Sequence, residues 1–171
     1  MVERSLSHAS GKDINSIDAA ALSRMSMSAL DELFAELEPA ALEQIQGRTR
    51  GRLVALRGFD WLPGFARGLA MSVVNRLPLW GGESFEGEFG TNTWLLPANI
   101  EFARCVVRRA PSLEEGEGET LRLDYDVAAN PKLLREVVSE LRVLRPGLFL
   151  VRTRYRVGQH APKLSYYLLE R

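Results

Sequence analysis

The sequence predicts a β-rich α+β fold in which about 7–8 antiparallel strands form a closed or nearly closed barrel. In residues 148–157, Arg152, Arg154 and Arg156 alternate with apolar or uncharged side chains, which is the period of a strand with one buried face. Similar alternation recurs in other segments, and residues 80–94 interleave glycines with aromatic residues, as short twisted strands do. Because closure removes exposed strand edges, we expect a lipocalin- or calycin-like barrel with N-terminal helices and a helix over one end.

The chain begins with a polar, aperiodic stretch that predicts a disordered tail over residues 1–15, followed by one barrel domain over residues 16–171. Ser28 is the expected N-cap of the first long helix. That helix carries an apolar stripe that must pack on another element: Leu30, Leu33, Phe34 and Leu37. Glu38 and Pro39 are expected to start a second short helix that ends at Gly47.

Residues 47–56 are the first expected strand, with a bend at Gly51. A longer helix is expected from about residue 61 to Leu77. Its apolar residues fall on one face at helical spacing: Phe65, Leu69, Val73 and Leu77. We expect this face to make tertiary contacts, either as an ordinary packing helix or as a lid over an open barrel end.

The second half of the chain consists mainly of strands and turns. Strands are expected over residues 99–109, 121–127, 140–145, 148–157 and 164–169, with a short helix over residues 132–138. Residues 111–120 hold four glutamates and two glycines, which predicts a solvated hairpin loop. Pro146 and Gly147 predict a tight turn between two of these strands.

The overall charge is balanced, with 22 basic and 22 acidic residues, so no field of the whole molecule attracts nucleic acid or an anionic membrane. Nearly all of the cations are arginines, and the row Arg152, Arg154 and Arg156 is expected to form a solvated outer face. Cys105 is the single cysteine and is expected to be a buried apolar residue. The N-terminus lacks an apolar leader, and no apolar run approaches the ~20 residues of a spanning helix, which predicts a cytoplasmic protein.

A barrel of about eight strands can hold one small ligand, so the residues expected to face inward are the candidate binding residues. These are Phe102, Arg104, Leu123, Tyr125, Phe149, Thr153, Tyr155 and Tyr166. Thr153, Tyr125 and Tyr155 would supply the hydroxyl groups, and Arg104 would hold an anionic group. For each of them the alternative is an ordinary core residue whose polar atoms are bonded within the protein.

Three functions are compatible with such a cavity. The first is binding or carriage of a small hydrophobic or amphipathic ligand of the fatty-acid or isoprenoid type. The second is a cyclase- or isomerase-type enzyme in which Tyr125 or Asp124 moves a proton. The third is a filled barrel that acts through its surface. The sequence shows no catalytic or metal motif, because His8 and His160 lack the partners that metal ligation or acid–base chemistry needs, and it implies no cofactor. It leaves the oligomeric state open.

Several short segments occur in an order that resembles the small bacterial and plant proteins built from a GXWXG module followed by a DUF4334 module. The segments are Leu37-Glu38-Pro39, Gly47-Arg48-Thr49-Arg50-Gly51, Trp80-Gly81-Gly82-Glu83-Ser84-Phe85, Leu123-Asp124-Tyr125-Asp126 and Tyr167-Leu168-Leu169-Glu170-Arg171. Thr49 stands where the family has its signature tryptophan, and Glu83 stands where it has a lysine. The resemblance implies a calycin-like small barrel and assigns no functional residue.

Overall fold

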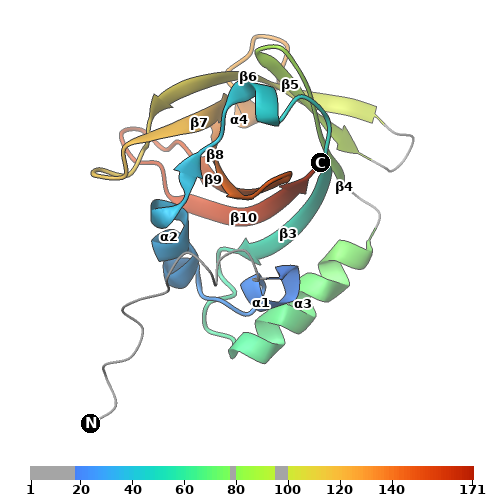
Figure 1. Ribbon diagram of the computed structural model, residues 1–171, viewed down its shortest axis with the longest axis vertical. Helices are drawn as coiled ribbons and strands as arrows, with labels where there is room; N and C mark the ends of the chain where they lie inside the picture. The colour runs from blue at the N-terminus through green and yellow to red at the C-terminus, as the bar shows by residue number, and fades with distance from the viewer. Residues whose placement is uncertain (1–17, 78–79, 95–99) are drawn as a thin grey trace.

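The computed structural model describes residues 18–77, 80–94 and 100–171, so the tail predicted over residues 1–15 lies outside the described residues. The chain forms a barrel with helices on its outside (Figure 1). The helices are α1 (Ala19–Leu22), α2 (Met27–Glu36), the 3-10 helix η2 (Leu42–Gln44), α3 (Gly64–Arg76) and α4 (Lys132–Arg135). The strands are β1 (Glu38–Pro39), β2 (Gly47–Arg48), β3 (Arg50–Leu56), β4 (Trp80–Glu86), β5 (Phe89–Trp94), β6 (Ile100–Pro111), β7 (Glu119–Asp124), β8 (Val137–Arg145), β9 (Leu148–Tyr155) and β10 (Lys163–Glu170).

The strands form one antiparallel sheet in the order β2-β4-β5-β6-β7-β8-β9-β10-β3, with β1 paired to β8. Because β2 and β3 are one stretch of chain interrupted at Thr49, both ends of the sheet belong to the same segment. The sheet therefore curls into a nearly closed barrel (Figure 1). The predicted fold class is confirmed.

Thr49 joins the two ends of the sheet. Its backbone N–H and its hydroxyl both donate to the carbonyl oxygen of Glu83 at 2.8 Å. Gly82 lies so close to this link that a Cβ there would stand 2.3 Å from the Thr49 carbonyl oxygen, and its φ of +122° also favours glycine. Beyond this point β3 leaves β4, and Asn75 of α3 bonds to the free strand edge. Its side-chain amide accepts from the Leu53 N–H at 2.8 Å and donates to the Leu53 carbonyl at 2.7 Å.

One half of the barrel interior is filled by apolar side chains. The buried core there includes Phe85, Leu121, Leu123, Leu141, Phe149, Val151 and Leu169. Ala40 and Ile45, which flank η2, belong to the same cluster, so the segment around η2 covers this end of the barrel. The other half of the interior holds the polar residues described below.

Helix α2 packs on the outside of β9 and β10. Its stripe of Leu30, Leu33 and Phe34 contacts a second buried cluster that includes Leu150, Tyr166 and Leu168. The N-cap is Ser26, whose hydroxyl accepts from the Ala29 N–H at 3.2 Å, rather than the predicted Ser28. The segment after the helix forms β1 and η2 instead of a second α-helix.

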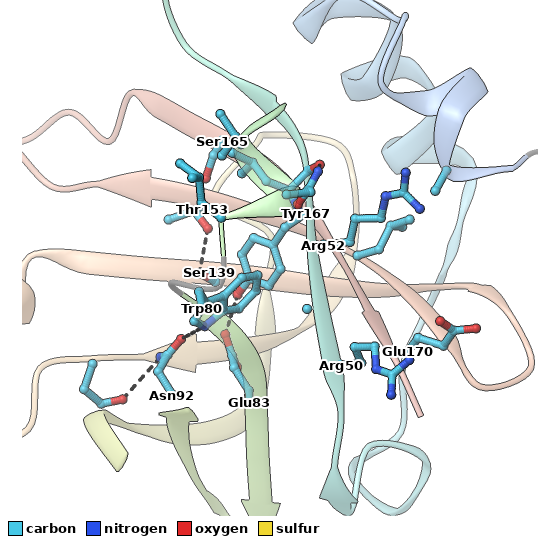
Figure 2. A pocket seen from close by; sticks show the side chains of 18 of the residues that line it. Arg50, Arg52, Trp80, Glu83, Asn92, Ser139, Thr153, Ser165, Tyr167 and Glu170 are labelled. Carbon is cyan, nitrogen blue, oxygen red and sulfur yellow. Dashed lines mark hydrogen bonds between the residues drawn. The ribbon is translucent and has the colours of Figure 1, made fainter. Parts of the chain in front are cut away.

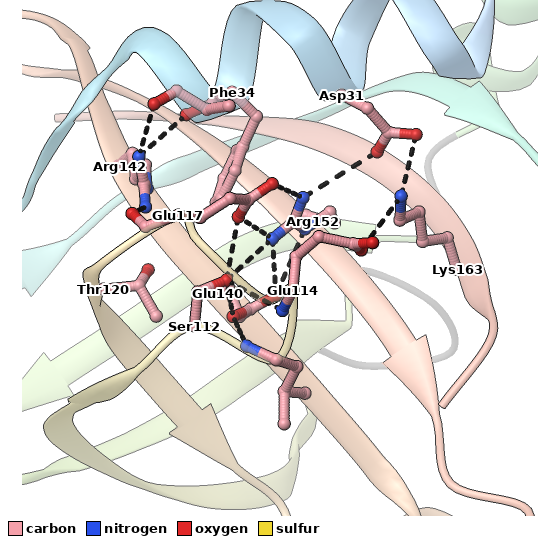
Figure 3. A network of polar contacts seen from close by, with 12 residues as sticks. Asp31, Phe34, Ser112, Glu114, Glu117, Thr120, Glu140, Arg142, Arg152 and Lys163 are labelled. Carbon is pink, nitrogen blue, oxygen red and sulfur yellow. Dashed lines mark hydrogen bonds and ion pairs between the residues drawn. The ribbon is translucent and has the colours of Figure 1, made fainter. Parts of the chain in front are cut away.

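The outer face of β8 and β9 is covered, which corrects the prediction of a solvated arginine row. Arg152 and Arg154 are only 0% and 6% exposed. Arg152 donates to Glu140 at 2.9 Å and to both oxygens of Glu117, and its guanidinium lies 4.2 Å from the centre of the Phe34 ring (Figure 3). The prediction of a solvated loop over residues 111–120 is therefore partly wrong, since residues 112–118 fold over the sheet and supply carboxylates to the buried Arg152 and Arg154.

Arg142 lies on the same face and caps the C-terminus of α2 with its side chain. Its guanidinium donates to the carbonyl oxygens of Ala35 and Leu37, both at 2.9 Å, and to that of Phe34 at 3.2 Å. Carbonyl groups at a helix C-terminus lack partners within the helix, and a cation there also interacts favourably with the helix dipole. Arg142 thus fixes α2 against the barrel.

Helix α3 contacts the barrel with a different face from the one predicted. Met71 is its buried residue and Asn75 bonds to β3. The predicted packing stripe points away from the protein, with Phe65 75% and Leu69 66% exposed. None of the helices in the described part of the chain is long and apolar enough to cross a membrane.

Candidate functional site

A cavity of about 1010 Å³, partly open to solvent, extends along both sides of β3. The part inside the barrel, which we call the inner lobe, is lined mainly by Trp80, Glu83, Asn92, Ala103, Tyr125, Leu134, Val137, Ser139, Thr153, Ser165 and Tyr167. The part outside β3, the outer lobe, is lined by Arg50, Arg52, Arg145, Leu148, Leu168 and Glu170. The C-terminal half of α3, residues 72–77, contributes to the cavity wall. Figure 2 shows the two groups of side chains on opposite sides of β3.

Glu83 is the charged residue of the inner lobe and is 1% exposed. It lies in β4, and the contacts between its backbone and Thr49 fix its position at the seam of the barrel. One carboxylate oxygen, Oε1, accepts hydrogen bonds from the Tyr167 hydroxyl at 2.7 Å and the Tyr125 hydroxyl at 3.1 Å. The other oxygen, Oε2, is buried and has no hydrogen-bond partner within the described residues. Such an atom is costly to bury, and the residue that carries it lines the cavity.

A chain of hydrogen bonds orients this carboxyl group. The indole N–H of Trp80 donates to the Asn92 side-chain oxygen at 2.8 Å, and the Asn92 amide nitrogen donates to the Tyr125 hydroxyl at 3.1 Å. Tyr125 then donates to Glu83. The Trp80 ring also packs edge-on against Tyr167, with 5.0 Å between ring centres. Each polar group in this chain is held by the next, so the carboxyl group is preorganised.

Burial raises the pKa of Glu83 from 4.5 to about 7, although the hydrogen bonds from Tyr167 and Tyr125 oppose this change. Burial and the nearby Glu83 raise the pKa values of both tyrosines, which therefore keep their protons. Near neutral pH, both the protonated and the ionised form of Glu83 are thus populated. It can donate a hydrogen bond or proton in one form and accept in the other.

The cavity also offers hydroxyl groups. Ser139 and Thr153 face each other across β8 and β9, and their hydroxyl oxygens lie 3.0 Å apart. Ser165 of β10 also lines the cavity. A ligand in the inner lobe would therefore meet hydroxyl groups as well as the Glu83 carboxyl group.

The structure brings four of the eight predicted binding residues into the barrel. Tyr125 and Thr153 line the inner lobe. Leu123 and Phe149 point inward as well, but they belong to the packed half. Tyr155 is half-buried near the end of β9 and is not among the residues that line the cavity.

The inward orientation predicted for Phe102, Arg104 and Tyr166 is wrong. Phe102 is 43% exposed and Arg104 is exposed, because the inward residues of β6 are Ala103, Cys105 and Val107. Both faces of this strand carry a mixture of residue types, so its alternation was ambiguous.

Tyr166 lies outside the barrel, where its hydroxyl donates to Asp31 of α2. Asp124, the other predicted proton carrier, is not among the residues that line the cavity. It pairs with Arg156 at 3.1 Å, and although burial opposes the change, Arg156 lowers its pKa. Tyr125 therefore keeps its place in the site, and Asp124 does not.

Four residues of the site were not predicted from the sequence: Trp80, Glu83, Asn92 and Tyr167. A signal was present for Glu83, because an acidic residue lies there in a segment of glycines and aromatic residues. No such signal identified Tyr167, since both faces of β10 are covered. Tyr166 and Leu168 are buried under α2 and Tyr167 lies inside the barrel, so the strand shows no alternation of apolar and polar residues.

Cys105 belongs to the packed core and is not among the residues that line the cavity. Cys105 is 1% exposed, as predicted, and burial together with Glu83 raises its pKa, so its thiol stays protonated. The described residues contain no group of three or more histidines, cysteines or acidic residues placed to hold a metal ion.

Comparison with known proteins supports the fold. No family model matches the chain and no curated protein matches it, so the resemblance to GXWXG/DUF4334 proteins stays a prediction. A crystal structure of a protein from Thermomonospora curvata is similar, with a TM-score of 0.63 and 17% sequence identity. The match covers 94% of this chain and 96% of that one. At this identity the likeness concerns the architecture alone.

Proposed function

We propose that the chain binds a small, largely apolar molecule with one neutral polar group, a hydroxyl or a carbonyl, in the inner lobe. The observation that carries this proposal is the buried Oε2 atom of Glu83, which has no partner within the described residues although the rest of its carboxyl group is firmly held. A ligand hydroxyl would donate to the carboxylate, and a ligand carbonyl would accept from the protonated acid.

The shape and chemistry of the cavity support an amphipathic ligand of the fatty-acid or isoprenoid type. Ligand sites are commonly apolar with a few convergent polar groups, and this cavity is large enough for such a molecule. Trp80, Leu134 and Val137 provide apolar walls in the inner lobe. Arg50 and Arg52 in the outer lobe suit an anionic end, where the ligand has one. The proposal includes the cytoplasmic location that the sequence predicts.

Farnesol and farnesal test this proposal because they differ mainly in their polar group. We expect the protein to bind farnesol more tightly at pH 8, where Glu83 is ionised, and farnesal more tightly at pH 5, where it is protonated. In Glu83→Gln the tyrosines would still donate to the amide oxygen, leaving the NH₂ group to donate to farnesal. This variant should bind farnesal at both pH values. At pH 8 it should bind farnesol about tenfold more weakly than the wild type does.

Native mass spectrometry of the protein titrated with each ligand measures both affinities. The same measurement on protein purified from its own cells shows whether a lipid-sized adduct is present. Glu86→Gln, an exposed glutamate on the same strand, is the matched control and should behave like the wild type. The proposal fails if neither probe binds, or if Glu83→Gln leaves the preference between alcohol and aldehyde unchanged.

A second candidate function, an isomerase- or cyclase-type enzyme, is favoured by the raised pKa of Glu83 inside a cavity. As a carboxylate, Glu83 would remove a proton from the γ-carbon of an α,β-unsaturated aldehyde such as farnesal, which conjugation with the carbonyl group makes acidic. The protonated acid would then return a proton to another carbon, so the double bond moves and no oxidant is needed. Tyr125 and Tyr167, which keep their protons, would hold the carboxyl group in place.

Deuterium uptake tests this activity. We expect farnesal incubated with the wild type in deuterated water to gain carbon-bound deuterium, with a rate that rises with pH and levels off above about pH 7. Glu83→Gln should reduce the rate to that of the buffer, because the amide cannot accept the proton. Equal uptake with the variant and the wild type would exclude Glu83 as the base. Binding of farnesal without deuterium uptake would support a carrier and exclude this enzyme activity for farnesal.

A further inference from the structure

The outer face of α3 carries a continuous row of exposed apolar side chains. Phe65, Leu69 and Val73 are spaced four residues apart within α3, which places them on one side of the helix. Trp61, in the turn before the helix, and Leu77, its C-cap, continue the exposed apolar row at both ends. Their exposed fractions run from 52% for Val73 to 80% for Trp61. We call these five residues the α3 stripe. In Figure 1, α3 lies at the periphery of the molecule, beside α1 and away from the barrel axis.

The charges around the α3 stripe are mainly positive. Residues 57–77 contain Arg57, Arg67 and Arg76 but a single acid, Asp60, whose carboxylate accepts the Met27 N–H at 2.9 Å. Arg24 packs against Gly68 of α3 and adds a further cation. The whole chain has no net charge, so this imbalance is local.

The same helix borders the cavity. Ser72, Asn75 and Arg76 of α3 line it, and Arg50 and Arg52 lie in its outer lobe. A surface that covered the α3 stripe would therefore lie next to one side of the cavity.

We propose that the α3 stripe docks on an anionic lipid surface. An interfacial helix of this kind presents tryptophan, phenylalanine and leucine to the acyl chains and basic residues to the lipid headgroups. A second copy of this chain fits less well, because a symmetric contact between two α3 helices would bring their arginines together. Docking also goes beyond the proposed function, since it involves a different face of the protein and needs no ligand in the cavity.

Vesicle flotation tests the proposal without any ligand. We expect the wild type to float with vesicles of phosphatidylcholine and phosphatidylglycerol in equal parts, and much less with vesicles of phosphatidylcholine alone. Added salt should weaken this binding because it screens the arginines. The double variant Phe65→Ser and Leu69→Ser should lower the bound fraction about tenfold or more, since it removes two large apolar side chains from the interface.

The controls separate lipid contact from loss of fold and from self-association. Leu133→Ser on α4 removes a side chain that is 76% exposed elsewhere and should float like the wild type. The double variant should keep the wild-type melting temperature, because both of its side chains are mainly in solvent. A charge variant, Arg57→Gln with Arg76→Gln, should weaken binding to the anionic vesicles and should not change binding to vesicles of phosphatidylcholine alone.

Two results would overturn the proposal. One is a wild-type protein that does not float with anionic vesicles, and the other is a double variant that floats as well as the wild type. Light scattering distinguishes self-association from lipid binding. If the wild type is a dimer that does not float with vesicles, and the double variant is a monomer, the α3 stripe is a surface for self-association instead. Because these experiments contain no cavity ligand, their failure would leave the binding of farnesol and farnesal untouched.

Discussion

Glu83→Gln is expected to stabilise the protein at pH 8 by about 3 kcal/mol and at pH 5 by less than about 1 kcal/mol. In the folded protein, burial raises the pKa of Glu83 from 4.5 to about 7, whereas the unfolded chain keeps the lower value. As the pH rises between these values, the unfolded state loses this proton before the folded state does, so wild-type stability falls. Each pKa unit corresponds to 1.36 kcal/mol, and glutamine removes the whole effect because it never ionises.

Urea denaturation of the two proteins from pH 5 to pH 8 measures this difference. Subtracting the variant from the wild type removes the contributions of other titrating groups, such as Glu114, whose pKa the hydrogen bond from Arg154 lowers. Glu86→Gln, at an exposed position, should give a difference that does not depend on pH. A variant that is less stable than the wild type at pH 8 would show that the Glu83 carboxylate is stabilised in the fold. A stabilising variant that loses ligand discrimination would instead show that the protein sacrifices stability for its site.

Arg152→Met is expected to lower the free energy of unfolding by about 3–5 kcal/mol. Arg152 is fully buried and bonds to Glu140, which is also fully buried, and to Glu117. Methionine fills much of the same space but leaves these carboxylates without their main cation. The loss comes less from the ion pair itself than from the uncompensated buried charge that remains.

Arg109→Met is the matched control, since Arg109 forms an ion pair with Glu119 in which both side chains are about 60% exposed. This change should cost less than about 1 kcal/mol. Combining Arg152→Met with Glu140→Gln should recover part of the loss, because the second change removes a stranded charge. Denaturant melts of the wild type, Arg152→Met, Glu140→Gln and the double variant give the coupling energy. If Arg152→Met costs no more than Arg109→Met, the buried network does not hold the loop of residues 112–118 and α2 on the barrel.

The strands could be predicted because their signal is local. Alternation along residues 148–157 corresponds to β9, and the glycine- and aromatic-rich residues 80–94 correspond to β4 and β5. A strand reports its period through neighbouring residues alone, and antiparallel closure follows from the need to pair every edge. The fold class therefore followed from the sequence although no family model matches it.

The candidate site could be predicted only in part, because it joins residues that are distant in the sequence. Tyr125 and Thr153 were identified because they lie on clearly alternating strands. Glu83 and Tyr167 were not, since their meeting depends on the seam at Thr49 and on the orientation of β10, whose two faces are both buried. Neither feature leaves a local pattern.

By itself, the sequence determined the main strands, the two longer helices and the barrel, because periodicity and turn residues act over a few positions. The tertiary structure alone decided which faces meet water. The arginines of β9 are buried because α2 and the loop of residues 112–118 cover them with carboxylates from distant segments. The apolar row of α3 is exposed because Met71 and Asn75 on another face attach the helix to the barrel. A strand or helix fixes which side chains share a face, but only the packing of the elements around it determines what covers that face.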